Sequence, residues 1–175
     1  PDYPVHLFFT RDGYFKKITP QSLRMSGEQK FKEGDVLTQQ QESTNAADLL
    51  FFSNKCQVYK SKTADFGDSK ASLLGDYIPA KLDFETDENA IYMVDTTDYK
   101  GYMLFIFDNG RIAKVPLSSY ATKTNRKKLI NAYCGKYNLH TILYIKEDCD
   151  LFLTSTNGRV LLVNSSAISP KATKD

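Results

Sequence analysis

Four short segments of the chain show the same order of apolar and polar residues. In residues 102–120, apolar residues that favour strands, such as Leu104 and Val115, lie on both sides of Asp108-Asn109-Gly110. Asn and Gly tolerate the positive φ angles that a two-residue turn needs, so this segment predicts a β-hairpin. The pattern therefore predicts strands joined by tight turns as the basic unit of the fold.

The other three segments repeat this hairpin pattern at a regular interval. They are Phe8–Ile18, Phe51–Lys60 and Phe152–Val163. Their turn positions recur about every 48 residues, close to the period of four-stranded propeller blades. These turn positions are Gly13, Cys56, Gly110 and Gly158. The repeat therefore predicts a propeller-like array rather than a leucine-rich or ankyrin solenoid, whose periods are shorter.

Each repeat holds about four expected strands, so we predict one all-β repeat domain over residues 1–175. A single unit of this kind cannot bury both faces of its sheet and needs neighbours. The expected blade-like units cover residues 5–47, 48–99, 100–149 and, incompletely, 150–175. The alternative is a sandwich or barrel built from four hairpins. Because the chain begins at Pro1 without Met, we expect it to be a piece of a longer protein. The unfinished fourth unit indicates either a partial or open part of a larger disc or a small disc of three to four blades.

The segments between the hairpins give further expectations. Strands are predicted at residues 34–37, 78–84, Ala90–Val94 and Thr141–Lys146. Loops are predicted at Gln39–Asn45 and, with a strongly basic composition, at Thr122–Lys128. Leu129–Tyr133 could be helical, but it occupies the place of a third strand in the other copies.

Composition supports the all-β prediction, and charge is unevenly distributed. Tyr and Phe number 11 each, and the net charge is only +2. Residues 101–133 hold six Lys or Arg and a single Asp, whereas residues 65–100 hold nine acidic residues and three lysines. This alternation predicts one basic and one acidic surface. The alternative is that the lysines only protect exposed strand edges from pairing.

Few residues could support catalysis or bind a metal. The three cysteines, Cys56, Cys134 and Cys149, lack paired spacing, and only His6 and His140 could assist a metal. We therefore expect reduced thiols, no cofactor and no metal. No apolar run reaches the ~18 residues of a membrane helix, so no membrane partner is expected. No pairing of a nucleophile with a base and no phosphate-binding glycine loop is present, so no catalytic residue is assigned.

The repeated phrase resembles that of a known family. An apolar strand is followed by Asn or Asp, Gly, Arg and a β-branched residue in Phe107–Ile112 and Thr154–Val160, and with an altered turn in Leu49–Lys60. This is similar to the repeat of the C-terminal domain of the A subunit of bacterial type IIA topoisomerases, DNA gyrase and topoisomerase IV. The resemblance covers essentially the whole chain.

The resemblance implies a fold and a role. The family domain is a β-pinwheel, a propeller-like disc whose neighbouring blades exchange strands, and it binds and bends duplex DNA on a basic outer rim. The catalytic tyrosine of the family lies in another region, so this piece is expected not to be an enzyme, although its parent would be an ATP-dependent DNA topoisomerase. Its implied partners are double-stranded DNA, the ATPase B subunit of the parent enzyme and the rest of the A subunit. The implied location is the cytoplasm, at the nucleoid.

Two features separate this chain from the gyrase pattern. The segment Leu23–Lys32 is the counterpart of the gyrase signature loop, and it keeps Gly27 and Gln29 but not the full run. Cys56 replaces the glycine of the repeat, and Leu162 replaces its usual basic residue. A topoisomerase IV-like or divergent relative therefore fits at least as well as gyrase.

DNA binding without base readout requires Lys and Arg that neutralise phosphates. We expect these contacts from basic residues that follow the hairpins and from basic residues in the loops. The candidates are Lys16, Lys17, Arg24, Lys30, Lys32, Lys60, Lys62, Arg111, Lys114, Lys123, Arg126, Lys127, Lys128 and Arg159. The alternative function is a protein-interaction propeller that does not bind DNA.

Overall fold

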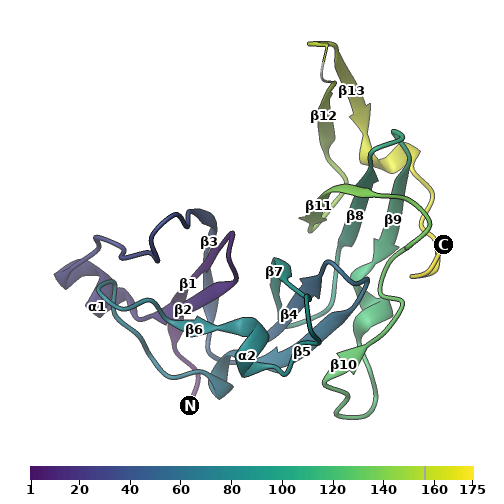
Figure 1. Cartoon of the computed structure of the whole chain (residues 1–175). Coiled ribbons are helices and arrows are strands. Elements are labelled where there is room, and N and C mark those ends of the chain that lie inside the picture. The colour runs from purple at the N-terminus through teal and green to yellow at the C-terminus, as the bar shows by residue number, and fades with distance from the viewer. Residues whose placement is uncertain (156) are drawn as a thin grey trace. The chain divides into compact units, whose positions relative to one another are not determined.

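The computed structural model describes residues 1–155 and 157–175, and Thr156, which belongs to the fourth copy of the repeat, lies outside the described residues. Most of the regular structure consists of strands arranged in small antiparallel sheets (Figure 1). This confirms the all-β prediction. The chain divides into two compact units, Pro1–Thr97 with Arg126–Ile130 (unit 1) and Asp98–Asn125 with Asn131–Asp175 (unit 2). The division into four blades stays a prediction.

The first sheet of unit 1 contains four strands in the order β3-β1-β2-β6. Its strands are β1 (Pro4–Thr10), β2 (Tyr14–Ile18), β3 (Leu37–Thr44) and β6 (Asp76–Tyr77). A short helix, α1 (Pro20–Met25), follows β2, with the Thr19 side chain accepting a hydrogen bond from the Ser22 N–H at its N-terminus. The edge strand β6 comes from beyond the second hairpin, so the first repeat borrows a strand from the next.

The second sheet of unit 1 repeats this arrangement in the order β10-β5-β4-β7. Its strands are β4 (Asp48–Ser53), β5 (Val58–Lys62), β7 (Ala90–Thr96) and β10 (Lys128–Leu129). Between β5 and β7 lie the 3₁₀ helix η1 (Thr63–Asp65) and the short helix α2 (Ile78–Lys81). Here too the edge strand, β10, comes from beyond the following hairpin.

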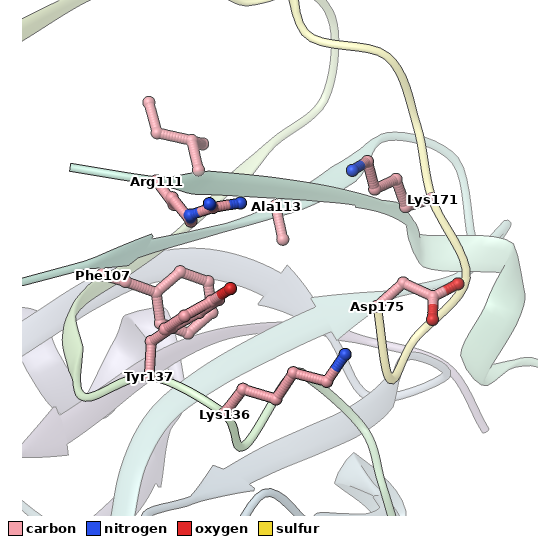
Figure 2. A pocket seen from close by; sticks show the side chains of 8 residues that line it. Phe107, Arg111, Ala113, Lys136, Tyr137, Lys171 and Asp175 are labelled. Atoms are coloured by element: carbon pink, nitrogen blue, oxygen red, sulfur yellow. The ribbon is translucent and has the colours of Figure 1, made fainter. Parts of the chain in front are cut away.

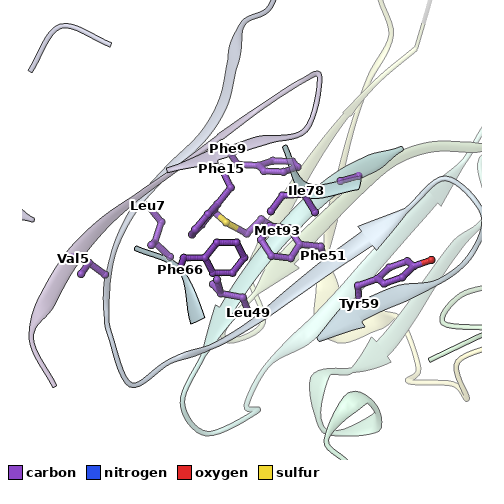
Figure 3. Close-up of a cluster of buried hydrophobic side chains, with 11 residues drawn as sticks. Val5, Leu7, Phe9, Phe15, Leu49, Phe51, Tyr59, Phe66, Ile78 and Met93 are labelled. Carbon is purple, nitrogen blue, oxygen red and sulfur yellow. The ribbon is translucent and has the colours of Figure 1, made fainter. Parts of the chain in front are cut away.

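Aromatic side chains from both sheets form the core of unit 1 (Figure 3). The Phe15 ring lies 5.6 Å from the Phe51 ring, edge to face, and 4.7 Å from the Phe66 ring. Phe9 also contacts Phe51, with centroids 5.8 Å apart. Such aromatic contacts add to the apolar burial that stabilises the packed sheets. The two hairpins therefore share one core, as the need for neighbouring repeats predicts.

Unit 2 contains the third and fourth hairpins. Its strands are β8 (Tyr102–Phe107), β9 (Ile112–Pro116), β11 (Leu139–Ile145), β12 (Asp150–Thr154) and β13 (Val160–Asn164). The first three form a sheet in the order β11-β8-β9, and the last two pair only with each other. The 3₁₀ helices η2 (Leu117–Tyr120) and η3 (Ser165–Ala167) follow β9 and β13. A small core of Leu104, Ile145 and Leu151 lies in this unit.

All four turn positions have positive φ angles, as predicted. The values are 95° at Gly13, 57° at Cys56, 83° at Gly110 and 81° at Gly158. The turns are longer than the two residues expected. The Gly110 N–H donates to the Phe107 carbonyl and the Phe107 N–H to the Arg111 carbonyl, both at 2.9 Å. This is a three-residue loop with glycine in the left-handed position.

Four predictions between the hairpins are wrong. Of residues 34–37, only Leu37 lies in a strand, because the chain turns at Glu33 and Gly34, where the φ angle of Gly34 is +82°. Gln39–Asn45 is not a loop, because residues up to Thr44 form strand β3, whose polar side chains find partners. Gln39, for example, exchanges two hydrogen bonds of 2.8 Å with the Met93 backbone. Residues 78–84 form α2 and a turn rather than a strand. Of Leu129–Tyr133, only Leu129 is in a strand. The strands predicted over Ala90–Val94 and Thr141–Lys146 are confirmed as β7 and β11.

None of the helices in the described residues is long and apolar enough to cross a membrane.

Candidate nucleic-acid interface

Strands β5 and β10 bring two basic segments of unit 1 side by side. Lys128 pairs with Tyr59 and Leu129 with Val58 in antiparallel register. The Lys60 N–H donates to the Lys127 carbonyl at 2.7 Å. We call this outer margin the β5–β10 edge, and its bases are Lys60, Lys62, Arg126, Lys127 and Lys128. The structure therefore joins two groups of predicted contact residues that are far apart in the sequence.

The basic residues of the β5–β10 edge differ in their exposure and in their partners. Lys62, Arg126 and Lys127 are exposed, and no carboxylate in the described part of the chain forms an ion pair with them. Lys128 is half-buried, with its Nζ 3.3 Å from Glu85 Oε1 and 5.6 Å from the centre of the Tyr59 ring. The edge thus presents three unpaired positive charges that a polyanion could neutralise.

Burial modifies the charge of Lys60, another basic residue of this edge. Lys60 is half-buried, and burial lowers the pKa of its ammonium, which the charge of Asp48 partly counteracts by raising it. The lowered pKa reflects the cost of keeping a charge away from water. A phosphate at this edge would act in the same direction as Asp48 and favour the charged lysine.

A network around Glu88 supports the strands beneath this edge. Glu88 is 3% exposed, and its carboxylate accepts hydrogen bonds from the side chains of Ser53, Gln57 and Tyr59 and from the Glu85 N–H. The Gln57 and Tyr59 bonds measure 2.7 Å and 2.6 Å. Burial raises the pKa of Glu88, but these hydrogen bonds outweigh it and hold the pKa below its ordinary value. Burial and the bond to Glu88 raise the pKa of Tyr59.

Three predicted DNA contacts are buried and must be removed from the candidate interface. Lys16, Lys17 and Lys114 are 2%, 3% and 3% exposed. Lys16 Nζ donates to the carbonyls of Lys30 and Ala71, and burial lowers its pKa. These ammonium groups are satisfied inside the protein and cannot reach a phosphate outside it.

Lys17 and Lys114 perform the same structural task in the two units. Each lies four residues after its turn glycine, and its ammonium donates to the carbonyl of the first residue of a 3₁₀ helix in the following repeat. Lys17 Nζ is 3.3 Å from the Thr63 carbonyl, and Lys114 Nζ is 3.0 Å from the Ser165 carbonyl. Lys114 also forms an ion pair of 2.6 Å with Asp148. These lysines therefore hold successive repeats together.

The remaining predicted residues are exposed but scattered. Arg24, Lys30 and Lys32 lie in or after α1, in the segment that resembles the gyrase signature loop, and Lys123, Arg111 and Arg159 lie in unit 2. Arg111 is joined at one cavity (Figure 2) by Lys136 and Lys171, which the sequence did not single out. Both lysines lie outside the repeated hairpin pattern, so no motif marks them. Among the described residues, no group of three or more His, Cys, Asp or Glu side chains could hold a metal ion.

Comparisons with known proteins agree with this architecture. No protein-family model matches the chain. The A subunit of DNA topoisomerase 4 from Staphylococcus aureus is 26% identical over 174 residues, which cover 97% of this chain and 22% of the relative. The C-terminal domain of DNA topoisomerase IV superposes with a TM-score of 0.81 and 24% identity, over 99% of this chain and 55% of that chain. The chain has the β-pinwheel fold seen in the C-terminal domains of topoisomerase A subunits.

Two further solved structures share this pinwheel fold. The E. coli ParC C-terminal domain gives a TM-score of 0.70 at 16% identity, over 98% of this chain and 68% of that one. The DNA gyrase A C-terminal domain gives 0.60 at 14% identity, over 98% of this chain and 58% of that one. The resemblance inferred from the repeated hairpin is thereby confirmed. The pinwheel chain spans about a fifth of the length of the curated relatives that it matches.

Proposed function

We propose that this pinwheel chain binds duplex DNA through its phosphate backbone at the β5–β10 edge. The observation that carries the proposal is that five Lys and Arg residues from two distant segments lie on one sheet margin. Three of them have no ion-pair partner in the described part of the chain. Each phosphate neutralised by Lys or Arg releases bound counterions, which supplies affinity without reading the base sequence. The binding is therefore independent of sequence and weakens as salt is added.

The bound duplex is bent, in the manner of architectural proteins. Bending a site of 20–30 base pairs costs on the order of 1–6 kcal/mol, and further phosphate contacts along the bend offset this cost. Exposed basic residues supply these further contacts. They are Arg24, Lys30 and Lys32 in unit 1 and Lys123 and Arg159 in unit 2. Ligation of nicked circles with the chain present tests this step, because bending or wrapping shifts the linking number and straight binding does not.

The parent protein that we propose is an ATP-dependent DNA topoisomerase of the topoisomerase IV type, located in the cytoplasm at the nucleoid. Its A subunit would include this chain, and its B subunit would supply the ATPase. The proposal is supported by the match to the A subunit of topoisomerase IV and by the higher TM-score with topoisomerase IV than with gyrase. Catalysis would lie outside this chain.

A gel-shift comparison of two triple variants tests the proposed edge. The first variant is Lys62→Gln, Arg126→Gln and Lys127→Gln, which removes the three unpaired charges. The matched control is Lys70→Gln, Lys81→Gln and Lys100→Gln, which removes the same charge from exposed positions in the acidic segment. We expect the first variant to bind a duplex much more weakly than the control. Equal losses would contradict the edge, and no binding by the unmodified chain at low salt would favour the protein-interaction alternative.

A further inference from the structure

Strand β10 has only two residues, yet it pairs with β5 in one definite register. Lys128 lies opposite Tyr59 and Leu129 lies opposite Val58. A shift of one residue would turn the side chains of a strand to the opposite face of the sheet. Because so short a strand forms about the same few backbone hydrogen bonds in any register, side-chain contacts have to select one.

Two side chains of the second repeat bind the ammonium group of Lys128. Its Nζ lies 3.3 Å from Glu85 Oε1 and 5.6 Å from the centre of the Tyr59 ring. The face of an aromatic ring attracts a cation, and side chains directly opposite each other are the contacts that stabilise paired strands. We call Tyr59 and Glu85 together the lysine receptor.

Both members of the lysine receptor are fixed by neighbours in the same repeat. The Tyr59 hydroxyl donates to Glu88 Oε1 at 2.6 Å, and its ring stacks on that of Phe84 with centroids 4.0 Å apart. Glu85 Oε2 accepts from the Gln57 side chain at 3.2 Å, and the Glu85 N–H donates to Glu88 Oε1 at 2.9 Å. A receptor that is already ordered loses less entropy when its ligand binds.

The edge strand of the first sheet is held by a different pair of side chains. In β6, Tyr77 lies directly opposite Tyr14 of β2, and the two rings are 5.1 Å apart. One exchanged strand is thus held by an aromatic pair and the other by an ammonium group on a carboxylate and a ring. Such a difference lets the opposed side chains match each strand to its own sheet.

We propose that Lys128 is a positioning residue, whose ammonium group sets the register of β10 by binding the lysine receptor. It contributes to the β5–β10 edge by keeping Arg126 and Lys127 beside β5 rather than by contacting a phosphate itself. This role goes beyond the proposed DNA binding and does not depend on it, because it concerns the exchange of strands within the chain.

A local measurement is needed, because the expected effect is small. An ion pair at a partly exposed position changes an equilibrium by no more than about fivefold. Hydrogen exchange of the Lys60 amide measures the docking of β10 directly, since its N–H donates to the Lys127 carbonyl. The Ser53 N–H donates to the Gln57 carbonyl within the second hairpin and serves as the internal reference.

Glu85→Gln is the first variant, because it removes the charge of the receptor and keeps an oxygen that can accept from Gln57. We expect exchange at the Lys60 amide to become about two- to fivefold faster, because the strand opens locally more often. Exchange at the Ser53 amide should stay unchanged. Glu42→Gln makes the same change at an exposed position of β3 and should alter neither amide.

A charge swap tests whether the two side chains act as a pair. Lys128→Glu alone places two carboxylates together and should speed exchange at the Lys60 amide more than Glu85→Gln does. Adding Glu85→Lys to this variant restores an ion pair of opposite direction and should recover part of the lost protection. Purely additive losses from the two substitutions would overturn the proposal.

Three further outcomes would also overturn it. The first is unchanged exchange at the Lys60 amide in Glu85→Gln. The second is equal acceleration at the Lys60 and Ser53 amides, which would show a general loss of stability. The third comes from Lys128→Gln, for which we expect faster Lys60 exchange and an unchanged slope of log DNA affinity against log salt. A slope reduced by about 0.9, with normal Lys60 exchange, would show that Lys128 contacts a phosphate.

Discussion

The backbone N–H of Lys60 donates a 2.7 Å hydrogen bond to the carbonyl of Lys127. Through this bond a segment that follows the third hairpin becomes the edge of the sheet built by the second. The exchange places two basic segments next to each other, which neither repeat could achieve alone. The proposed DNA-binding edge is therefore a product of strand exchange between repeats.

Lys114 should matter for stability rather than for DNA binding. Lys114→Met leaves the Ser165 carbonyl and the Asp148 carboxylate without the ammonium that now bonds both. Loss of a partner by a buried polar group costs about 1–3 kcal/mol, so we expect a decrease of that size in the free energy of unfolding, measured by urea denaturation. Lys146→Met, at an exposed position, is the control and should change little. A decrease in DNA affinity without a decrease in stability would show that Lys114 contacts DNA after all.

Gly75 should tolerate no side chain. A Cβ at this position would lie 2.3 Å from the Phe15 carbonyl oxygen, and the φ angle is +89°. Gly34 has a similar φ of +82°, but a Cβ there would meet no atom within 4 Å. Gly34→Ala should therefore cost about 1–2 kcal/mol from backbone conformation alone, whereas Gly75→Ala should cost more because strand β2 must move. Equal melting temperatures for the two variants would contradict this account of the β2–β6 contact.

Glu88 should make the stability of unit 1 depend on pH in the acidic range. Its folded-state pKa lies below the ordinary value of 4.5, so its contribution is fully present above that value and is lost as the pH falls through the lower, folded-state pKa. Glu88→Gln should lower stability at pH 7, because an amide oxygen is a weaker acceptor for the four donors. It should also flatten the pH dependence below 4.5. Chemical denaturation of both proteins at neutral and acidic pH measures this, and parallel curves would rule out Glu88 as a source.

The hairpins were predictable because their signal is local. A glycine or an equivalent residue with positive φ, between two apolar runs, determines each turn, and even Cys56 adopts the required conformation at 57°. Strand β3 was not predictable in this way. Its sequence is polar, and Gln39 and Gln41 become strand residues because their amides bond to Met93 and Asp95 of β7. Such partners are known only once the sheets have packed.

The candidate site was predictable in composition but not in detail. The sequence identified the basic loop at Arg126–Lys128, and the structure shows that Lys60 and Lys62 lie on the same edge. It also pointed to Lys17 as a surface contact, although that side chain is buried. An alternating strand pattern cannot reveal that a lysine points inward when its ammonium finds a carbonyl from another repeat. Burial of a charge depends on tertiary partners, which spacing does not encode.

The central claim is that this pinwheel chain binds DNA by its phosphates at the β5–β10 edge, and one titration tests it most directly. Fluorescence anisotropy would measure the affinity for two duplexes of unrelated sequence over a series of salt concentrations, for the unmodified chain and for the variant lacking the charges of Lys62, Arg126 and Lys127. We predict equal affinities for the two duplexes, a steep decrease with salt, and a shallower slope for the variant by about 0.9 for each phosphate that it no longer neutralises. Binding that ignores salt, or a variant with an unchanged slope, would contradict the claim.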